Sequence, residues 1–219
     1  MRREFHIHNI TWHYIENTSA KDIQFLAEHF RFHPLDLQDC YEIAQRPKLD
    51  VYPNYLFLIF QFPYYDSKQR RIRIQTLNVF IGKGFFITLT QESIPLLAEY
   101  FQELQQKGAR EPKLDRLRNT SGYLLYKVLD LLFGSSVRLL DTMNEQIVAT
   151  EEEVYSEQTK QAAKNIGIIR RNIMSLRRLV QPQVRIVGQL VNMDTTFVPT
   201  SLSVYFDDSK LLRVGGDVT

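Results

Sequence analysis

The segment that decides the fold reads HPLDLQDCYEIAQRPKLDVYPNYLFLIF and runs from His33 to Phe60. Its last part, continued to Phe62, is apolar at nearly every position and is bounded by Pro53-Asn54 and Pro63. An apolar run this short between proline-containing turns predicts a β-strand that is buried on both faces. We therefore expect the rest of the fold to pack around residues 55–62.

A short acidic helix is predicted at the start of this segment. His33-Pro34 can begin the helix, because proline is tolerated in the first helical turn. The side chains expected to face inward are Leu35, Leu37 and Ile43. Asp36 and Asp39 are three residues apart, and this spacing places both carboxylates on one side of the helix.

The first half of the chain, residues 1 to about 115, has mixed α and β patterns. Alternating apolar residues predict strands over residues 5–8 and 10–15, and Thr18 and Ser19 can cap a helix over residues 20–30. Two further strands are expected over residues 72–81 and 85–90, joined by Gly82-Lys83-Gly84 as a hairpin turn. A helix over residues 94–104 completes this half.

After Arg110 the pattern becomes helical. Apolar or small residues recur at steps of three and four from residue 122 to 154 and again from residue 166 to 190. The second run consists of Ile166, Ile169, Ile173, Leu176, Val180, Val187 and Leu190. We expect two long antiparallel helices that turn near residues 155–159, with a kink at Pro182. The first helix is mainly acidic and the second mainly basic, which favours their pairing, although an exposed ion pair contributes only ~0.2–1 kcal/mol.

The overall composition excludes several classes of protein. The 219 residues are 44% hydrophobic and 24% charged with a net charge of +2, which is ordinary for a soluble domain and does not indicate nucleic-acid binding. A single cysteine, Cys40, forms no internal disulfide and fits a reducing compartment. The longest unbroken apolar run, residues 55–60, is far below the ~18–20 residues that a membrane-spanning helix needs. No secretory signal and no phosphotransfer or hydrolase motif is recognisable.

Several small motifs have both a chemical and a structural interpretation. His6 and His8 are two residues apart and would share a strand face, where they could bind Zn²⁺ or simply form a polar, solvated face. Gly82-Lys83-Gly84 lacks the full phosphate-loop pattern and favours a hairpin turn. Cys40 has no signature of a catalytic nucleophile around it. The basic side chains of the second long helix lack interleaved aromatic residues, so solvated charges are the simpler interpretation.

Carboxylates are the remaining candidates for chemistry. Asp36, Asp39, Asp130, Asp207 and Asp208 are hard oxygen ligands of the kind that Mg²⁺ binds while keeping several waters. Spacing alone does not bring any two of them together, and surface solvation or helix capping explains them equally well.

Motifs along nearly the whole chain resemble one family. They are TWHYIENTS around Trp12, HPLDLQD at residues 33–39, RPKLD at residues 46–50, the apolar strand over residues 55–60, LLYKVLD at residues 124–130, the region around Pro182, and YFDD at residues 205–208. In this combination the chain resembles the cytoplasmic domain of CorA-type divalent-cation transporters. The resemblance implies an α/β fold, with a mixed sheet in an α/β/α sandwich, followed by a long antiparallel helical hairpin.

The same resemblance implies a function and an organisation. The family's members are membrane-bound pentamers that conduct hydrated Mg²⁺, with Co²⁺ or Ni²⁺ as alternatives, and they are not enzymes. Residues 1–115 would be the α/β domain on the cytoplasmic face of the inner membrane, residues 116–200 the hairpin, and residues 201–219 the start of a truncated stalk. The family's membrane helices and its Gly-Met-Asn pore motif do not occur in these 219 residues, which we therefore expect to be a soluble part that is monomeric or non-native in its assembly.

The family's regulatory metal sites lie between protomers. By resemblance, Asp39 and Asp208 would face each other across two neighbouring subunits, and Asp130 would belong to a second site. Gln38 stands where an acidic residue is common, so the second site would be weaker or missing. Bound Mg²⁺ would hold the subunits closed, and its loss would let carboxylate repulsion loosen them.

Two alternative functions remain open from the sequence. One is the cytoplasmic domain of a ZntB-like zinc transporter, which keeps the fold and changes the ion. The other is a soluble helical-hairpin module that binds proteins without a metal. Transport assays with Mg²⁺ and Zn²⁺ would distinguish a ZntB-like zinc transporter from a CorA-type transporter. The sequence downstream of Thr219 would test the helical-hairpin module.

Overall fold

Six strands form one mixed sheet in the order β1-β2-β6-β5-β4-β3. The computed structural model describes residues 2–42, 46–107, 120–155 and 159–208. The strands are β1 (Arg2–Ile7), β2 (Ile10–Glu16), β3 (Lys48–Val51), β4 (Tyr55–Asp66), β5 (Arg71–Gly82) and β6 (Phe85–Thr90). Neighbouring strands are antiparallel except β2 and β6, which are parallel. The mixed sheet expected from the sequence is confirmed.

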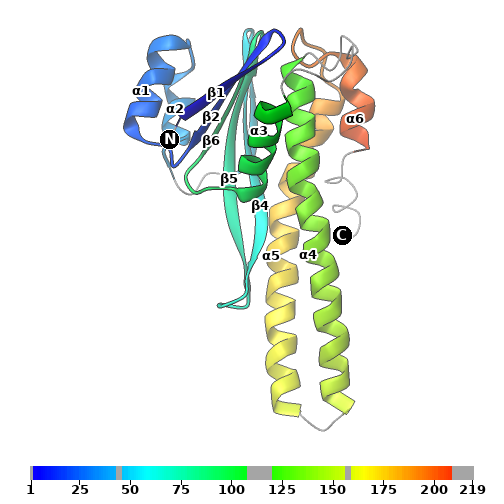
Figure 1. Cartoon of the computed structure of the whole chain (residues 1–219). Helices are drawn as coiled ribbons and strands as arrows, with labels where there is room; N and C mark the ends of the chain where they lie inside the picture. The colour runs from blue at the N-terminus through cyan, green and yellow to red at the C-terminus, as the bar shows by residue number, and fades with distance from the viewer. Residues whose placement is uncertain (1, 43–45, 108–119, 156–158, 209–219) are drawn as a thin grey trace.

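Helices cover both faces of this sheet (Figure 1). They are α1 (Ala20–His29), α2 (Pro34–Asp39), α3 (Pro95–Lys107), α4 (Ser121–Tyr155), α5 (Thr159–Val191) and α6 (Ser203–Asp207), with a 3₁₀ turn at Thr200–Leu202. Helices α1 and α2 lie on one face, and α3, α4 and α5 lie on the other (Figure 1). The α/β/α sandwich with a long antiparallel helical hairpin is therefore confirmed.

Strand β4 is buried on both faces, as predicted. Leu56, Leu58 and Phe60 belong to the core under α4 and α5, while Phe57 and Ile59 belong to the smaller core under α1 and α2. Because side chains alternate along a strand, one apolar run supplies both cores.

The prediction that Pro63 ends this strand is wrong, because β4 continues to Asp66. Two residues earlier, the backbone N–H of Gln61 points away from β5 and donates to Gln183 Oε1 at 2.8 Å. Pro63 has the same orientation in the strand, so its missing N–H falls on the side away from β5. A proline at such an edge position removes no hydrogen bond from the sheet.

On helix α2, the carboxylate of Asp36 is buried and the side chain of Leu35 is exposed. Leu35 was expected to face inward but is 61% exposed, whereas Asp36 is only 1% exposed and Leu37 is buried. The tyrosine hydroxyls that hydrogen-bond Asp36 make its burial tolerable. Ile43, the third residue expected to face inward, lies outside the described residues.

The hairpin of α4 and α5 extends beyond the sheet (Figure 1). The apolar run that predicted α5 is only partly buried there, since Ile166 is 52% exposed and Ile173 is 38% exposed. In the part of the chain that the structure describes, no third element covers that side of the two-helix arm. These side chains line an open apolar groove of about 370 Å³ between the two helices.

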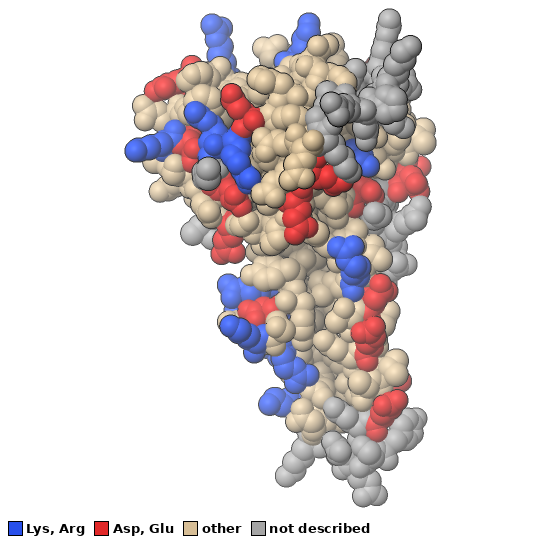
Figure 2. Space-filling view, in the orientation of Figure 1, with Lys and Arg blue, Asp and Glu red and all other residues tan. Residues whose placement is uncertain are grey.

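The charges of the hairpin lie on separate outer surfaces. Asp141, Glu145, Glu151 and Glu152 of α4 are exposed, and so are Lys164, Arg170, Arg171, Arg177 and Arg178 of α5. Figure 2 shows the acidic groups along the α4 side of the arm and the basic groups along the α5 side. The pairing across the hairpin that the sequence favours is not seen for these side chains, and the arm depends on its apolar contacts instead.

Candidate metal centre

Helix α2 is positioned by contacts at its first residue. His33 caps the helix by accepting a hydrogen bond from the Leu35 backbone N–H at 3.3 Å, and Pro34 occupies the first turn. The backbone N–H of His33 donates to the Tyr55 hydroxyl at 2.8 Å. The start of α2 is thereby tied to the first residue of the central strand β4.

Asp36 is a structural carboxylate under this helix. The hydroxyls of Tyr55 and Tyr52 donate to its two oxygens at 2.9 and 3.2 Å. Burial raises the pKa of Asp36, while the two hydrogen bonds and the nearby charge of Lys48 oppose that rise. Asp36 is therefore poorly accessible to an ion from solvent, although it contributes negative charge to its surroundings.

Asp39 lies one turn further along α2 and is more accessible, with 19% of its side chain exposed. The ammonium of Lys48 is 2.6 Å from Asp39 Oδ2, 2.6 Å from Asp50 Oδ2 and 3.9 Å from Asp36 Oδ1. Partial burial would lower the pKa of Lys48, but hydrogen bonds to Asp39 and Asp50 raise it above its ordinary value. Asp39 is thus a surface carboxylate that faces a fully charged lysine.

Asp130 and Asp208 both lie near Tyr126, on the other side of the molecule from α2. Burial and the negative charges of Asp130 and Asp208 raise the pKa of Tyr126, which places both carboxylates near that hydroxyl. Asp130 is one helical turn after Tyr126 on α4. Asp208 directly follows α6 as its C-cap, and its backbone N–H donates to the Val204 carbonyl at 3.1 Å.

Two aromatic contacts fix α6 at that position. The rings of Tyr205 and Phe206 lie 5.3 and 6.1 Å from the ring of Tyr126, and Phe206 is fully buried in the larger core. Asp208 itself remains exposed. The structure therefore brings Asp130 and Asp208 into one neighbourhood and leaves Asp39 in another, with the sheet between α2 and α6 (Figure 1).

The donor atoms suit a hard cation, but the described residues of one chain do not form a full site. Within the described residues, no cluster of three or more histidine, cysteine, aspartate or glutamate side chains could hold a metal ion. Mg²⁺ binds through one or two carboxylates and keeps several waters, so an exposed aspartate is a suitable partial ligand. The carboxylate oxygens of Asp39 and Asp208 are donors of the type that Mg²⁺ prefers.

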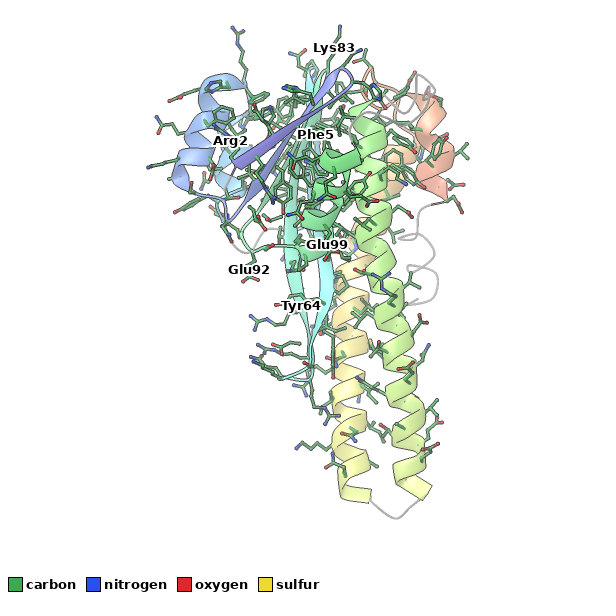
Figure 3. The ribbon with its side chains drawn as sticks, viewed as in Figure 1. Arg2, Phe5, Tyr64, Lys83, Glu92 and Glu99 are labelled. Carbon is green, nitrogen blue, oxygen red and sulfur yellow. The ribbon has the colours of Figure 1, made fainter. Side chains whose placement is uncertain are left out.

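The other sequence motifs have structural explanations. His6 lies on β1, but His8 lies in the turn after it with φ of 51°, so the expectation that both share a strand face is wrong. Cys40 is buried, and burial raises the pKa of its thiol, which makes it a poor nucleophile. Lys83 is exposed in the β5–β6 turn and extends away from the sheet (Figure 3).

Sequence reasoning missed Lys48 and Asp50. Both belong to the RPKLD motif, and their spacing of two places them on the same face of a strand. The strand itself, β3, was not predicted, because four residues after a proline carry little periodicity. Only the pairing of β3 with β4 brings Lys48 under α2.

Comparison with known proteins supports one family. A model of the family described as CorA-like Mg²⁺ transporter protein matches residues 8–210. The cobalt/magnesium transport protein CorA of Thermotoga maritima is 25% identical over 199 residues, which cover 90% of this chain and 55% of that protein. The putative metal ion transporter YfjQ of Bacillus subtilis is 22% identical over 202 residues, which cover 91% of this chain and 60% of that protein. The chain thus spans little more than half the length of these relatives.

Solved structures share the fold. The soluble domain of CorA from Methanocaldococcus jannaschii has a TM-score of 0.81 at 15% identity, over 96% of this chain and 82% of that one. The ZntB cytoplasmic domain from Vibrio parahaemolyticus has a TM-score of 0.71 at 17% identity, over 95% of this chain and 80% of that one.

Transporters of a membrane family have membrane-spanning helices. Within the described residues, no helix is both long enough and apolar enough to cross a membrane. The match to the family model nevertheless extends over most of the sequence. The chain belongs to the family of CorA-like Mg²⁺ transporters, which are transport proteins and not enzymes.

Proposed function

We propose that residues 1–219 form the Mg²⁺-sensing, regulatory part of a divalent-cation transporter. The observation that carries the proposal is the position of the two aspartates: Asp39 on α2 and Asp208 at the end of α6 are both accessible and lie on opposite sides of the sheet. Each can contribute half of a ligand set that a neighbouring copy of the chain completes. The proposed assembly is a pentamer at the cytoplasmic face of the membrane, with the membrane-spanning part supplied by the full-length protein.

The proposed mechanism follows from the charges. Two carboxylates brought together across an interface repel each other unless a cation lies between them. Mg²⁺ would therefore stabilise the assembly in which Asp39 of one copy faces Asp208 of the next. The ion shifts the equilibrium only by its difference in affinity between the closed and the loosened assembly. When its concentration falls, the empty sites repel and the interface loosens.

Asp130 is proposed to contribute to a second site. The charges of Asp130 and Asp208 both raise the pKa of Tyr126, which supports an electrostatic coupling between the two sites. The neutral Gln38 beside Asp39 removes one potential ligand, and its amide donates to Glu42 at 2.9 Å. We expect this second site to be the weaker of the two.

The choice of ion follows from the donor atoms. The proposed ligands are all carboxylate oxygens, which suit Mg²⁺ better than Zn²⁺, for which nitrogen and sulfur ligands are preferred. Co²⁺ is the alternative suggested by the name of the Thermotoga maritima relative. Parallel titrations with Mg²⁺, Co²⁺ and Zn²⁺ would rank the ions.

The experiment that tests the proposal measures thermal unfolding and sedimentation of the chain over a range of Mg²⁺ concentrations. Asp39→Asn and Asp208→Asn should each remove most of the Mg²⁺-dependent rise in melting temperature. Asp141→Asn is the matched control, because Asp141 is an exposed carboxylate of α4 outside the proposed site. If both site variants respond to Mg²⁺ as the wild type does, these residues do not bind the ion.

A further inference from the structure

We propose that Lys48 is a tethered cation that competes with the divalent ion for Asp39 and thereby sets the concentration at which the site fills. The inference rests on the proposed role of Asp39 as a metal ligand. Lys48 is not one of the proposed metal ligands. Its ammonium group lies among the carboxylates of Asp36, Asp39 and Asp50.

The geometry places Lys48 where an ion would otherwise bind. Its Nζ atom is 2.6 Å from Asp39 and 2.6 Å from Asp50, with Asp36 at 3.9 Å. Lys48 and Asp50 project from the same face of β3, towards α2, since Asp50 pairs with Phe57, a residue of the core under α1 and α2. The ammonium also lies 5.0 Å from the centre of the Phe57 ring. Strand β3 therefore fixes the backbone of Lys48, and the ammonium group of its side chain reaches Asp39 on α2.

This arrangement forces an exchange when a divalent ion binds. Asp39 Oδ2, one of the two oxygens that could take Mg²⁺ or one of its waters, is already paired with an ammonium. Two cations beside one carboxylate repel each other, so Lys48 must withdraw from Asp39 as the ion arrives. Asp50 offers the lysine a partner during this withdrawal, because it already lies at 2.6 Å. Lys48 and Asp50 thus act together: the lysine occupies the ligand, and the second carboxylate retains the lysine after its release.

Opposite effects are expected from the two partners. Lys48→Met removes the charge and keeps an apolar stem against Phe57, so the Mg²⁺ concentration at half-maximal stabilisation should fall by about three- to ten-fold. Asp50→Asn removes the alternative partner of the lysine, so the same midpoint should rise. Lys48→Arg keeps the charge and should leave the midpoint near the wild-type value.

The double variant separates competition from a general effect of charge. If Asp50 acts through Lys48, Asp50→Asn should have little effect once Lys48→Met is present. If Asp50 instead attracts Mg²⁺ directly, its substitution should weaken the response equally in both backgrounds, and the exchange mechanism is wrong. The readout is the Mg²⁺ midpoint and not the melting temperature without Mg²⁺, so a variant that is merely less stable does not imitate competition.

The outcomes also distinguish this proposal from the one on which it rests. Lack of a Mg²⁺ response in the wild type, or a normal response in Asp39→Asn, overturns the metal site itself and the competition with it. A Mg²⁺ response that Asp39→Asn abolishes, together with an unchanged or higher midpoint in Lys48→Met, overturns only the role of Lys48. Titration of the wild type and the five variants by thermal unfolding in parallel gives both answers.

Discussion

At the scale of single residues, hydrogen-bonding partners determine which polar side chains are buried. Asp36 is buried and Leu35 is exposed on the same short helix, because two tyrosine hydroxyls are available for the carboxylate. The reverse arrangement would place a leucine against polar groups and leave those hydroxyls unpaired. One turn later, Asp39 is only partly buried and finds its partner on a different element, Lys48 of β3.

A second buried polar residue, His13, makes stability depend on pH. It lies on β2 in contact with the rings of Phe25 and Phe30, at 6.1 and 5.6 Å between ring centres, and its Nδ1 is 3.6 Å from Glu4. Burial lowers the pKa of His13 below its ordinary value of 6.5, while Glu4 opposes that shift. The unfolded chain therefore takes up the proton first as the pH falls.

The sign of this linkage gives a prediction. The contribution of neutral His13 to stability is present above pH 6.5 and declines as the pH falls from there towards the lower pKa of the folded state. His13→Gln, which does not become charged, should show a smaller loss of stability between pH 7.5 and pH 5.5 than the wild type. Urea unfolding at both pH values measures the difference. The same substitution at exposed His8 is the control, and equal pH dependence in all three proteins would contradict the prediction.

At the scale of elements, side-chain amides of α5 replace missing strand neighbours. Beyond β3, no strand of the described residues lies beside the outer edge of β4. There Gln183 of α5 both accepts from the Gln61 N–H and donates to the Gln61 carbonyl at 2.8 Å. Asn172 of α5 plays the same part at the start of β5. Its side chain accepts a hydrogen bond from the Ile72 N–H and donates one to the Arg70 carbonyl, both at 3.2 Å. These bonds fix where the helix crosses the long strands.

Replacing Gln183 with an apolar residue of similar volume should therefore destabilise the fold, although the packing volume is kept. Gln183→Leu keeps a similar volume but leaves two backbone groups of Gln61 without this partner, and we expect a loss of about 1–3 kcal/mol. Gln181→Leu changes an exposed glutamine two residues away and should stay within about 0.5 kcal/mol of the wild type. Denaturant unfolding of both variants compares the two, and similar losses would show that the amide contributes nothing specific.

Gly122 allows the start of α4 to lie close to the segment that precedes α6. A Cβ atom on Gly122 would lie 2.5 Å from the Phe197 carbonyl oxygen and 2.9 Å from Leu202 Cδ1. The Gly122 N–H donates to that same carbonyl at 2.9 Å. This close contact positions the chain that leads to Asp208.

Gly122→Ala should accordingly cost about 1–3 kcal/mol through overpacking, and it should weaken any Mg²⁺ response that depends on Asp208. Gly167→Ala is the matched control on α5, because a Cβ there meets nothing within 4 Å. Alanine favours the helix, so the control should gain up to about 1 kcal/mol. Thermal unfolding measures both changes, and a Gly122→Ala protein as stable as the wild type would show that the contact relaxes freely.

At the scale of the whole molecule, the sheet separates α2 from α6, so one chain does not bring Asp39 to its own Asp208 (Figure 1). A site made from both residues then needs two copies, and its occupancy must depend on protein concentration. The neighbouring pair of Asp130 and Asp208 lies within one chain, and binding there would lack that dependence.

Protein concentration therefore distinguishes the two arrangements. At a fixed Mg²⁺ concentration, raising the protein concentration about ten-fold should increase the Mg²⁺-dependent rise in melting temperature when the site lies between copies. Sedimentation under the same conditions should show larger species with Mg²⁺ than without it. A rise in melting temperature that is independent of protein concentration would place the ion within a single chain.

The sequence by itself determined the elements whose signals are local. The apolar run at residues 55–62 predicted a strand buried on both faces, and the spacing of apolar residues after position 122 predicted two long helices, because burial of a regular element leaves its own period in the chain. Only the tertiary structure decided which side chains meet. Lys48 reaches Asp39 because β3 pairs with β4 beneath α2, and Ile166 stays exposed because no third element among the described residues covers the arm. Such contacts join residues through the packing of separate elements, and packing leaves no periodic pattern that a single chain could reveal.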